Sequence, residues 1–198
     1  PVVVKGHSAH PGTGEIVAQA ILAAITACGV PEGAFSLVQG GKRDVGEALV
    51  QHPLINAVGF TGSLGGGRAL FDLCAARANP IPFFGELGSV NPMFLLPQAL
   101  AARAAAIATG WAGSLTMGAG QFCTNPGIAV VIAGEHADTF VATAQAALAA
   151  VGPQTMLTDG IAQAYRQGRD RIAAATGVQS VLTSVCDMRQ ATPYLFEV

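Results

Sequence analysis

Charged side chains are the scarcest feature of this sequence. Its 198 residues include 10 basic and 12 acidic ones, or 11% in all, where an average soluble domain has about a quarter. Because 51% of the residues are hydrophobic, a disordered chain is excluded. The 25 glycines and 11 prolines follow no period, which excludes a collagen-like chain. So few charges barely cover a free-standing globule, which predicts an oligomer or a part of something larger.

Clusters of basic residues are missing as well. The net charge is -2, and Lys42-Arg43 is the only adjacent basic pair. Surfaces that bind nucleic acids or anionic membranes need such clusters, so we expect neither partner. The longest uncharged run, residues 104–134, contains six glycines and a proline. That run predicts a buried helix followed by a strand, since a membrane-spanning helix needs about 20 mostly apolar residues.

Cysteine is also sparse, and the four cysteines lie far apart without a CxxC pair. Such spacing favours neither a metal site nor a disulfide framework. Free thiols are typical of reducing compartments, and the first residues lack the pattern of a secretory signal. We therefore expect a cytoplasmic protein that holds no metal.

Short β-branched or aromatic runs alternate with helical stretches in the first part of the chain. The predicted strands are residues 2–4, 35–38, 57–60 and 81–84, and the predicted helices are 13–28, 44–52 and 66–78. Asp44 and Glu47 have the spacing of a capping box. The alternation predicts parallel strands joined by crossover helices. Because the strands are continuous apolar runs, we expect an α/β fold, a Rossmann-like parallel sheet with helices on both faces.

The same alternation begins again after Pro92. The expected strands are 93–96, 128–133, 178–182 and 194–198, and the expected helices are a long Ala-rich one from about residue 98, then 138–151 and 159–175. We therefore predict part of a second α/β domain, with the first domain at residues 1–88 and the second at 89–198.

A glycine-rich turn, residues 60–67, connects a predicted strand to a predicted helix. Such a turn presents free backbone N–H groups and the positive end of a helix dipole to an anion. It is neither a P-loop nor a G-x-G-x-x-G fingerprint. The alternative is a connector whose glycines only allow unusual backbone angles.

Two charged residues stand at the ends of predicted strands, where ligands bind in open α/β sheets. Lys5 can reach a ribose or a phosphate there. Glu86 follows an apolar strand, and burial at that position would make its carboxylate a better general base. Each can also be an ordinary solvated side chain.

Cys123 lies in a glycine-containing loop between a long helix and a strand. A thiolate in such a loop is a strong nucleophile that a substrate can approach closely. Free cysteines are more often small buried hydrophobic residues, and we predict that role for Cys28, Cys74 and Cys186.

The order of these four features resembles the aldehyde dehydrogenase superfamily, and the resemblance runs along nearly the whole chain. The matching motifs are Val3-Val4-Lys5, Phe60-Thr61-Gly62-Ser63, Glu86-Leu87-Gly88 and Gly120-Gln121-Phe122-Cys123-Thr124. In the family they form the strand-end lysine, the pyrophosphate turn, the catalytic glutamate and the nucleophile.

The resemblance implies a mechanism for a small-molecule aldehyde substrate. Cys123 would attack the aldehyde, with its own backbone N–H helping to hold the oxyanion, and Glu86 would activate the water that hydrolyses the thioester. The residues implied in binding NADP or NAD are Lys5, Ser8, Gly41, Thr61, Gly62, Ser63, Gly67 and Leu87, with Gly41 near the adenine.

Two departures from the family pattern are informative. Ser8 stands where the family usually has a glutamate on the adenosine 2′-hydroxyl, which favours NADP, or both cofactors, over strict use of NAD. The family usually reads Glu-Leu-Gly-Gly-Lys at the glutamate, whereas this chain has Glu86-Leu87-Gly88-Ser89-Val90-Asn91-Pro92. With the stretch 7–13, this variant is similar to the branch that oxidises 2-oxoglutarate semialdehyde.

The resemblance also implies that the chain is about two-fifths of a full enzyme, with residues 1–88 as the C-terminal part of a cofactor-binding domain and 89–198 as the N-terminal part of a catalytic domain. The full enzyme would be a homo-oligomer, a dimer or tetramer, and the chain alone would have little turnover. Two alternatives stay open. One is an acylating dehydrogenase or acyltransferase, in which the Cys123 thioester passes to a thiol. The other is a non-catalytic fragment that keeps only the fold.

Overall fold

The computed structural model describes residues 1–198, which form two compact units. The N-terminal unit is Pro1–Gly88 and the C-terminal unit is Ser89–Val198. The assignment of these stretches to a cofactor-binding and a catalytic domain stays a prediction.

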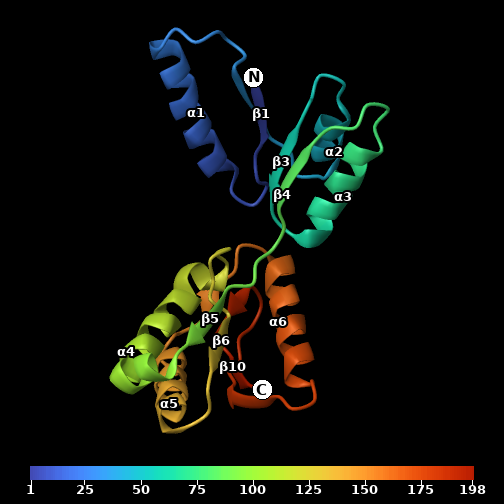
Figure 1. Cartoon of the computed structure of the whole chain (residues 1–198). Helices are drawn as coiled ribbons and strands as arrows, with labels where there is room; N and C mark the ends of the chain where they lie inside the picture. Colours follow the sequence, from blue (N-terminus) through green and yellow to red (C-terminus); the bar gives the residue numbers. More distant parts are fainter. The chain divides into compact units, whose positions relative to one another are not determined.

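The N-terminal unit contains two β-α-β segments joined by a short helix. Its elements are β1 (Val2–Lys5), α1 (Pro11–Ala27), β2 (Phe35–Val38), α2 (Asp44–Gln51), β3 (Val58–Thr61), α3 (Leu64–Ala75) and β4 (Phe83–Glu86). β1 pairs in parallel with β2, and β3 with β4, with α1 and α3 as the crossovers (Figure 1). The predicted α/β class with parallel strands is confirmed, and the parallel strands are distributed over separate two-stranded sheets.

Two local predictions in this unit are wrong. Residue 43 is the N-cap of α2, and its side chain makes no capping hydrogen bond. The Asp44 carboxylate accepts from the N–H of Val45 at 2.8 Å. Because Asp44 is the first residue of the helix and not its N-cap, it forms no capping box with Glu47. The last strand lies two residues later than predicted. Pro82 has no N–H to donate to a ladder, so pairing begins after it and extends to Glu86.

The C-terminal unit mixes parallel and antiparallel pairs. Its elements are β5 (Pro92–Leu95), α4 (Pro97–Thr116), the 3₁₀ turn η1 (Met117–Gly120), β6 (Ile128–Val131), α5 (Glu135–Ala149), β7 (Gln154–Thr155), α6 (Asp159–Ala173), β8 (Gln179–Leu182), β9 (Gln190–Ala191) and β10 (Leu195–Glu197). β5 and β6 are parallel, whereas β8 with β10 and β7 with β9 are antiparallel. The sequence did not predict β7 and β9, since strands of two residues have no periodicity.

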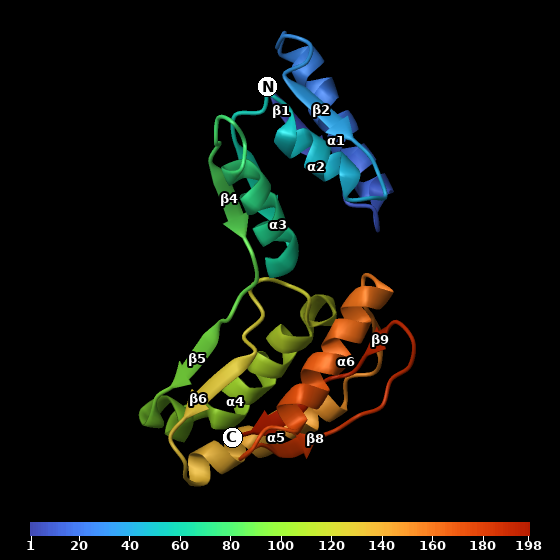
Figure 2. The same cartoon turned by 90° about the vertical axis from the view of Figure 1, so that its right-hand side faces the viewer.

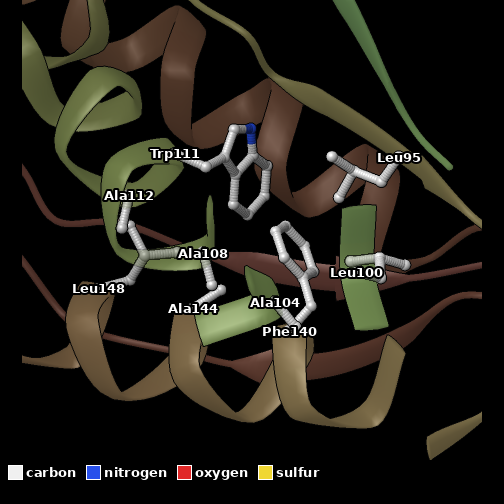
Figure 3. Close-up of a cluster of buried hydrophobic side chains, with 9 residues drawn as sticks. All are labelled: Leu95, Leu100, Ala104, Ala108, Trp111, Ala112, Phe140, Ala144 and Leu148. Carbon is white, nitrogen blue, oxygen red and sulfur yellow. The ribbon is translucent and has the colours of Figure 1, made fainter. Parts of the chain in front are cut away.

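The core of this unit lies between α4, α5 and β5, and α5 runs alongside α4 (Figure 2). Nine buried hydrophobic residues fill it (Figure 3). Alanines at 104, 108 and 144 face this core and let the two helix backbones approach closely. The ring centroids of Trp111 in α4 and Phe140 in α5 lie 5.4 Å apart. This packing fixes the end of α4, from which the Cys123 loop leaves.

The β5–β6 pair presents two apolar faces. Met93, Leu95 and Val131 point into the core, while Phe94 and Val130 on the other face are 67% and 43% exposed. None of the helices combines the length and the hydropathy that a bilayer-spanning segment requires.

Candidate active site

The Cys123 loop, residues 117–127, begins with a reversal of the backbone. Gly118, Ala119 and Gly120 have φ angles of 59°, 57° and 71°, in the left-handed region that favours glycine. At Gly120 an added Cβ would also lie 3.3 Å from the carbonyl oxygen of Leu115. The chain can therefore turn back immediately after α4, which brings Asn125 next to Leu115 at the end of that helix.

Side-chain amides and an indole fix this loop. Asn91 Nδ2 donates to the carbonyl oxygens of Cys123 at 2.8 Å and Asn125 at 3.0 Å. Asn125 Nδ2 in turn donates to the carbonyl oxygen of Leu115 at 2.8 Å. The indole N–H of Trp111 donates to the carbonyl oxygen of Pro126 at 2.7 Å. A segment without regular secondary structure is thus tied to α4 and to the residue that precedes β5.

Cys123 itself is exposed. Its carbonyl accepts from Asn91, while its backbone N–H donates to no group of the chain. A free N–H on the residue that carries a nucleophile is the arrangement that stabilises an oxyanion in acyl transfer. The loop can therefore offer both a thiolate and one oxyanion donor to a carbonyl compound.

Glu86 is the last residue of β4, and its main chain is tied to the glycine-rich turn. The N–H of Gly62 donates to the carbonyl oxygen of Glu86 at 3.0 Å, continuing the pairing of Thr61 with Glu86. The side chain of Glu86 is exposed, which agrees with the solvated alternative and not with a buried carboxylate. Phe84, two residues earlier in the same strand, is 68% exposed.

The turn after β3 has the features of an anion site. Ser63 caps α3 by accepting from the N–H of Gly66 at 3.2 Å, and the N–H groups of Leu64 and Gly65 have no acceptor in the chain, as expected in a first helical turn. No atom lies within 4 Å of the place where a side chain on Gly65 would begin. Free N–H groups beside open space fit a phosphate, so this turn can accept the pyrophosphate of a dinucleotide.

Gly67 and Leu87 contact each other. Gly67 is buried in α3, and a Cβ placed on it would lie 1.9 Å from Leu87 Cδ2 and 2.9 Å from Leu87 Cγ. Gly67 therefore has a packing role in this chain, and contact of either residue with a cofactor stays a prediction.

Lys5, Ser8 and Gly41 lie in the segments that follow β1 and β2. Lys5 Nζ donates to the carbonyl oxygens of Gly6 at 3.1 Å and Gly40 at 3.0 Å, so its ammonium group lies beside Gly41. Ser8 is exposed in the turn before α1. Parallel strands place such residues at one edge of a sheet, where nucleotides bind in open α/β proteins.

The structure thus groups the predicted residues within each unit. In the N-terminal unit, Lys5 lies beside Gly41, and the turn at 61–63 is bonded to the strand that ends at Glu86. In the C-terminal unit, Cys123 is held by Asn91, which the sequence indicated only as part of a departure from the family pattern. Trp111 and Asn125 gave no sequence signal, because hydrogen bonds to carbonyl groups leave no periodicity.

The other cysteines differ among themselves. Cys74 is buried as predicted, and this burial raises the pKa of its thiol. Cys28 is exposed, so its predicted role as a buried hydrophobic residue is wrong; it caps the end of α1 and lies outside the packed face. Cys186 is half-buried and its thiol donates to the carbonyl oxygen of Gln190 at 3.2 Å. No three His, Cys, Asp or Glu side chains gather as metal ligands.

Comparison with known proteins gives several matches. "Alpha-ketoglutaric semialdehyde dehydrogenase 2" of Azospirillum brasilense is 52% identical over 181 residues, covering 91% of this chain and 34% of that protein. "Alpha-ketoglutaric semialdehyde dehydrogenase" of Acinetobacter baylyi is 44% identical over 198 residues, covering 99% and 37%. The chain therefore spans about a third of the length of these curated relatives.

Solved structures show the same fold. An NAD-dependent benzaldehyde dehydrogenase from Corynebacterium glutamicum superposes with a TM-score of 0.81 at 24% identity, over 98% of this chain and 42% of that one. A glyceraldehyde-3-phosphate dehydrogenase from Methanocaldococcus jannaschii complexed with NADP superposes with a TM-score of 0.78 at 24% identity, over 99% of this chain and 43% of that one.

The resemblance seen in four short motifs thus extends through the fold. The sequence model described as "Aldehyde dehydrogenase family" matches residues 1–172, a stretch that includes Lys5, the turn at 60–67, Glu86 and Cys123. The chain belongs to the aldehyde dehydrogenase family.

Proposed function

We propose that this protein oxidises an aldehyde to a carboxylate with NADP or NAD. The observation that carries the proposal is the setting of Cys123, an exposed thiol whose carbonyl is held by Asn91 and whose N–H is free. The names of the curated relatives support 2-oxoglutarate semialdehyde as the substrate.

The chain's own residues account for the bonds to sulfur. Cys123 gives its proton to water and its sulfur attacks the carbonyl carbon. The C–S bond forms while the C=O π bond opens, and the resulting oxyanion accepts a hydrogen bond from the Cys123 N–H. Once the carbon has lost a hydride, the oxyanion returns to a carbonyl and leaves a thioester. Glu86 takes a proton from water, the resulting hydroxide attacks the thioester, and the C–S bond breaks to release the acid and the thiolate.

The dinucleotide supplies the hydride acceptor when it is bound. The residues proposed to hold it are Thr61, Gly62 and Ser63 at the pyrophosphate and Lys5 with Ser8 at the adenosine ribose. Ser8 favours a 2′-phosphate because it can donate a hydrogen bond and brings no negative charge. Gly41 near the adenine, Gly67 and Leu87 complete the proposed set.

The protein's wider setting is part of the same proposal. We expect a homo-oligomer in the cytoplasm that acts on a small molecule and has no nucleic-acid or membrane partner.

The test is a pair of serine variants in the full-length gene product that contains these residues. Cys123→Ser should lower aldehyde-dependent NADPH formation by more than about 10³-fold, as removal of a nucleophile does elsewhere. Cys28→Ser, at an exposed cysteine of the other unit, should keep the parent rate. Full activity of Cys123→Ser would refute the proposal, and acyl-CoA formed in place of the acid would assign an acylating enzyme.

A further inference from the structure

Asn91 contacts the main chain on both sides of Thr124. Its side-chain NH₂ group has two protons, and both are used, one on the carbonyl oxygen of Cys123 at 2.8 Å and one on that of Asn125 at 3.0 Å. Asn91 is half-buried and directly precedes β5, which is paired with β6 inside the C-terminal unit. The amide therefore joins the nucleophile to a fixed strand.

The other ties of the loop do not contact the residue that carries the thiol. Trp111 holds Pro126, and Asn125 holds Leu115. Gln121 is bonded to Gly118 and to Leu157. Each of these bonds fixes a flank of the loop, whereas Asn91 alone fixes the carbonyl of Cys123.

Fixing this carbonyl has a consequence for chemistry. The Cys123 carbonyl defines the plane of the peptide bond that follows the nucleophile, and the bond from the Asn125 N–H to the carbonyl oxygen of Phe122 at 3.1 Å closes the turn on the other side. With both sides held, the free N–H and the Cα–Cβ bond of Cys123 keep one orientation. Donors that are oriented before the reaction stabilise developing charge without reorganisation.

We propose that Asn91 is a positioning residue for Cys123, an inference that rests on the proposed function. It holds the nucleophile's peptide so that the thiolate and the free N–H face the aldehyde together. Loss of these two hydrogen bonds slows formation of the thiohemiacetal and thioester. Cofactor binding is unchanged, because the proposed cofactor residues lie at other positions.

The experiment compares three variants of the full-length gene product. Asn91→Ala removes both donors, and Asn91→Asp keeps the size but places a carboxylate against two carbonyl oxygens. Asn79→Ala is the control, since Asn79 is exposed and lies in the N-terminal unit, away from the Cys123 loop. The readouts are the rate of the first turnover, kcat, the KM for NADP and the melting temperature.

Asn91→Ala should slow the first turnover and kcat by roughly 10- to 100-fold, somewhat less than the loss of an oxyanion donor itself, with the KM for NADP within about threefold of the parent. Asn91→Asp should be at least as slow near neutral pH. Its rate relative to the parent should rise as the pH falls, because the protonated carboxyl can again donate one hydrogen bond. Asn79→Ala should match the parent.

A first-turnover rate of Asn91→Ala within twofold of the parent would overturn the inference. The inference would also be overturned if the lower rate of Asn91→Ala were fully explained by a smaller fraction of folded protein, and if the rate of Asn91→Asp relative to the parent did not rise at low pH. The two failures are distinguishable: an active Cys123→Ser variant defeats the proposed function, whereas an inactive Cys123→Ser with a fully active Asn91→Ala defeats this inference alone.

Discussion

At the scale of single residues, Cys123 and Glu86, the proposed nucleophile and general base, have main chains fixed by hydrogen bonds and side chains that are exposed. The carbonyl of Cys123 is bonded to Asn91, and the carbonyl of Glu86 is bonded to Gly62. Both side chains are exposed. Within each unit, the main chain fixes the position from which the side chain starts and leaves the tip of the side chain free.

The proposed preference for NADP also depends on one residue, Ser8. Replacing Ser8 with glutamate should weaken NADP binding by at least about tenfold, or 1.4 kcal/mol, because a carboxylate repels a 2′-phosphate at short range. NAD binding should stay the same or improve. Calorimetric titration with each cofactor measures the effect, and Ser36→Glu is the control because Ser36 is an exposed residue of β2. Equal losses for both cofactors would contradict this role of Ser8.

At the scale of secondary-structure elements, α3 is joined to β4 at two points. The turn that begins the helix donates to Glu86 through Gly62, and one turn into the helix Gly67 packs against Leu87. The proposed pyrophosphate turn and the proposed general base therefore belong to one packed segment.

This packing predicts a compensating pair of substitutions. Gly67→Ala should lower the free energy of unfolding by about 1–3 kcal/mol, the usual cost of overpacking, because its Cβ would overlap Leu87. Leu87→Ala removes the overlapping atoms, so the double variant should be more stable than the sum of the two losses predicts, by at least about 1 kcal/mol. Gly65→Ala, where the space is open, should be close to neutral. Urea denaturation measures all four, and strict additivity would contradict the packing.

A second element, α6, predicts a dependence of stability on pH. Burial, with smaller effects of Tyr194 and Cys186, raises the pKa of Tyr165 from 10.0 to about 12, and its hydroxyl donates to the carbonyl oxygen of Thr192 at 2.8 Å. The folded state thus favours the neutral phenol of Tyr165. The stability gained in this way is fully present below the pKa of tyrosine in the unfolded chain, and it is lost as pH rises from about 10 to about 12.

Tyr165→Phe should therefore melt at a lower temperature than the parent at pH 8, by the loss of one hydrogen bond worth about 1 kcal/mol. Its melting temperature should fall less steeply than that of the parent above about pH 10. Thermal melts followed by circular dichroism across this range give both slopes. Parallel curves for the two proteins would show that Tyr165 is not the group responsible.

Most of the elements could be predicted from the sequence, and the contacts within the site could not. The stretch 35–38 was predicted at its observed bounds, because turn residues flank a short apolar run. The sequence left open whether Glu86 is buried or solvated, because the apolar strand before it does not show what lies over that strand. The role of Asn91 depends on two hydrogen bonds across more than 30 residues of chain, which no local pattern reveals.

At the scale of the whole molecule, the shortage of charge is matched by exposed apolar side chains. The outer face of β5 and β6 carries Phe94, Ile128 and Val130, which are 67%, 47% and 43% exposed. A contiguous apolar face rimmed by few charges favours association.

The 198-residue chain alone should therefore associate and bind a hydrophobic dye. Phe94→Ser combined with Ile128→Thr should reduce both the association and the dye binding. The helical circular dichroism signal should be kept, because the core lies on the other face of the β5–β6 pair. Leu54→Ser is the control, since Leu54 is an exposed residue of a loop. Sedimentation velocity and dye fluorescence measure the outcome, and a monomer that binds no dye would contradict the expectation.

The most direct measurement is the mass of the Cys123 peptide during turnover. In the full-length gene product with Glu86→Gln, incubated with 2-oxoglutarate semialdehyde and NADP, hydrolysis should be slow and the thioester should accumulate. Proteolysis and mass spectrometry should then find the acyl group on Cys123, only when NADP is present, and on no peptide of Cys123→Ser. An unmodified Cys123, or an acyl group on Cys28, Cys74 or Cys186, would contradict the proposed reaction.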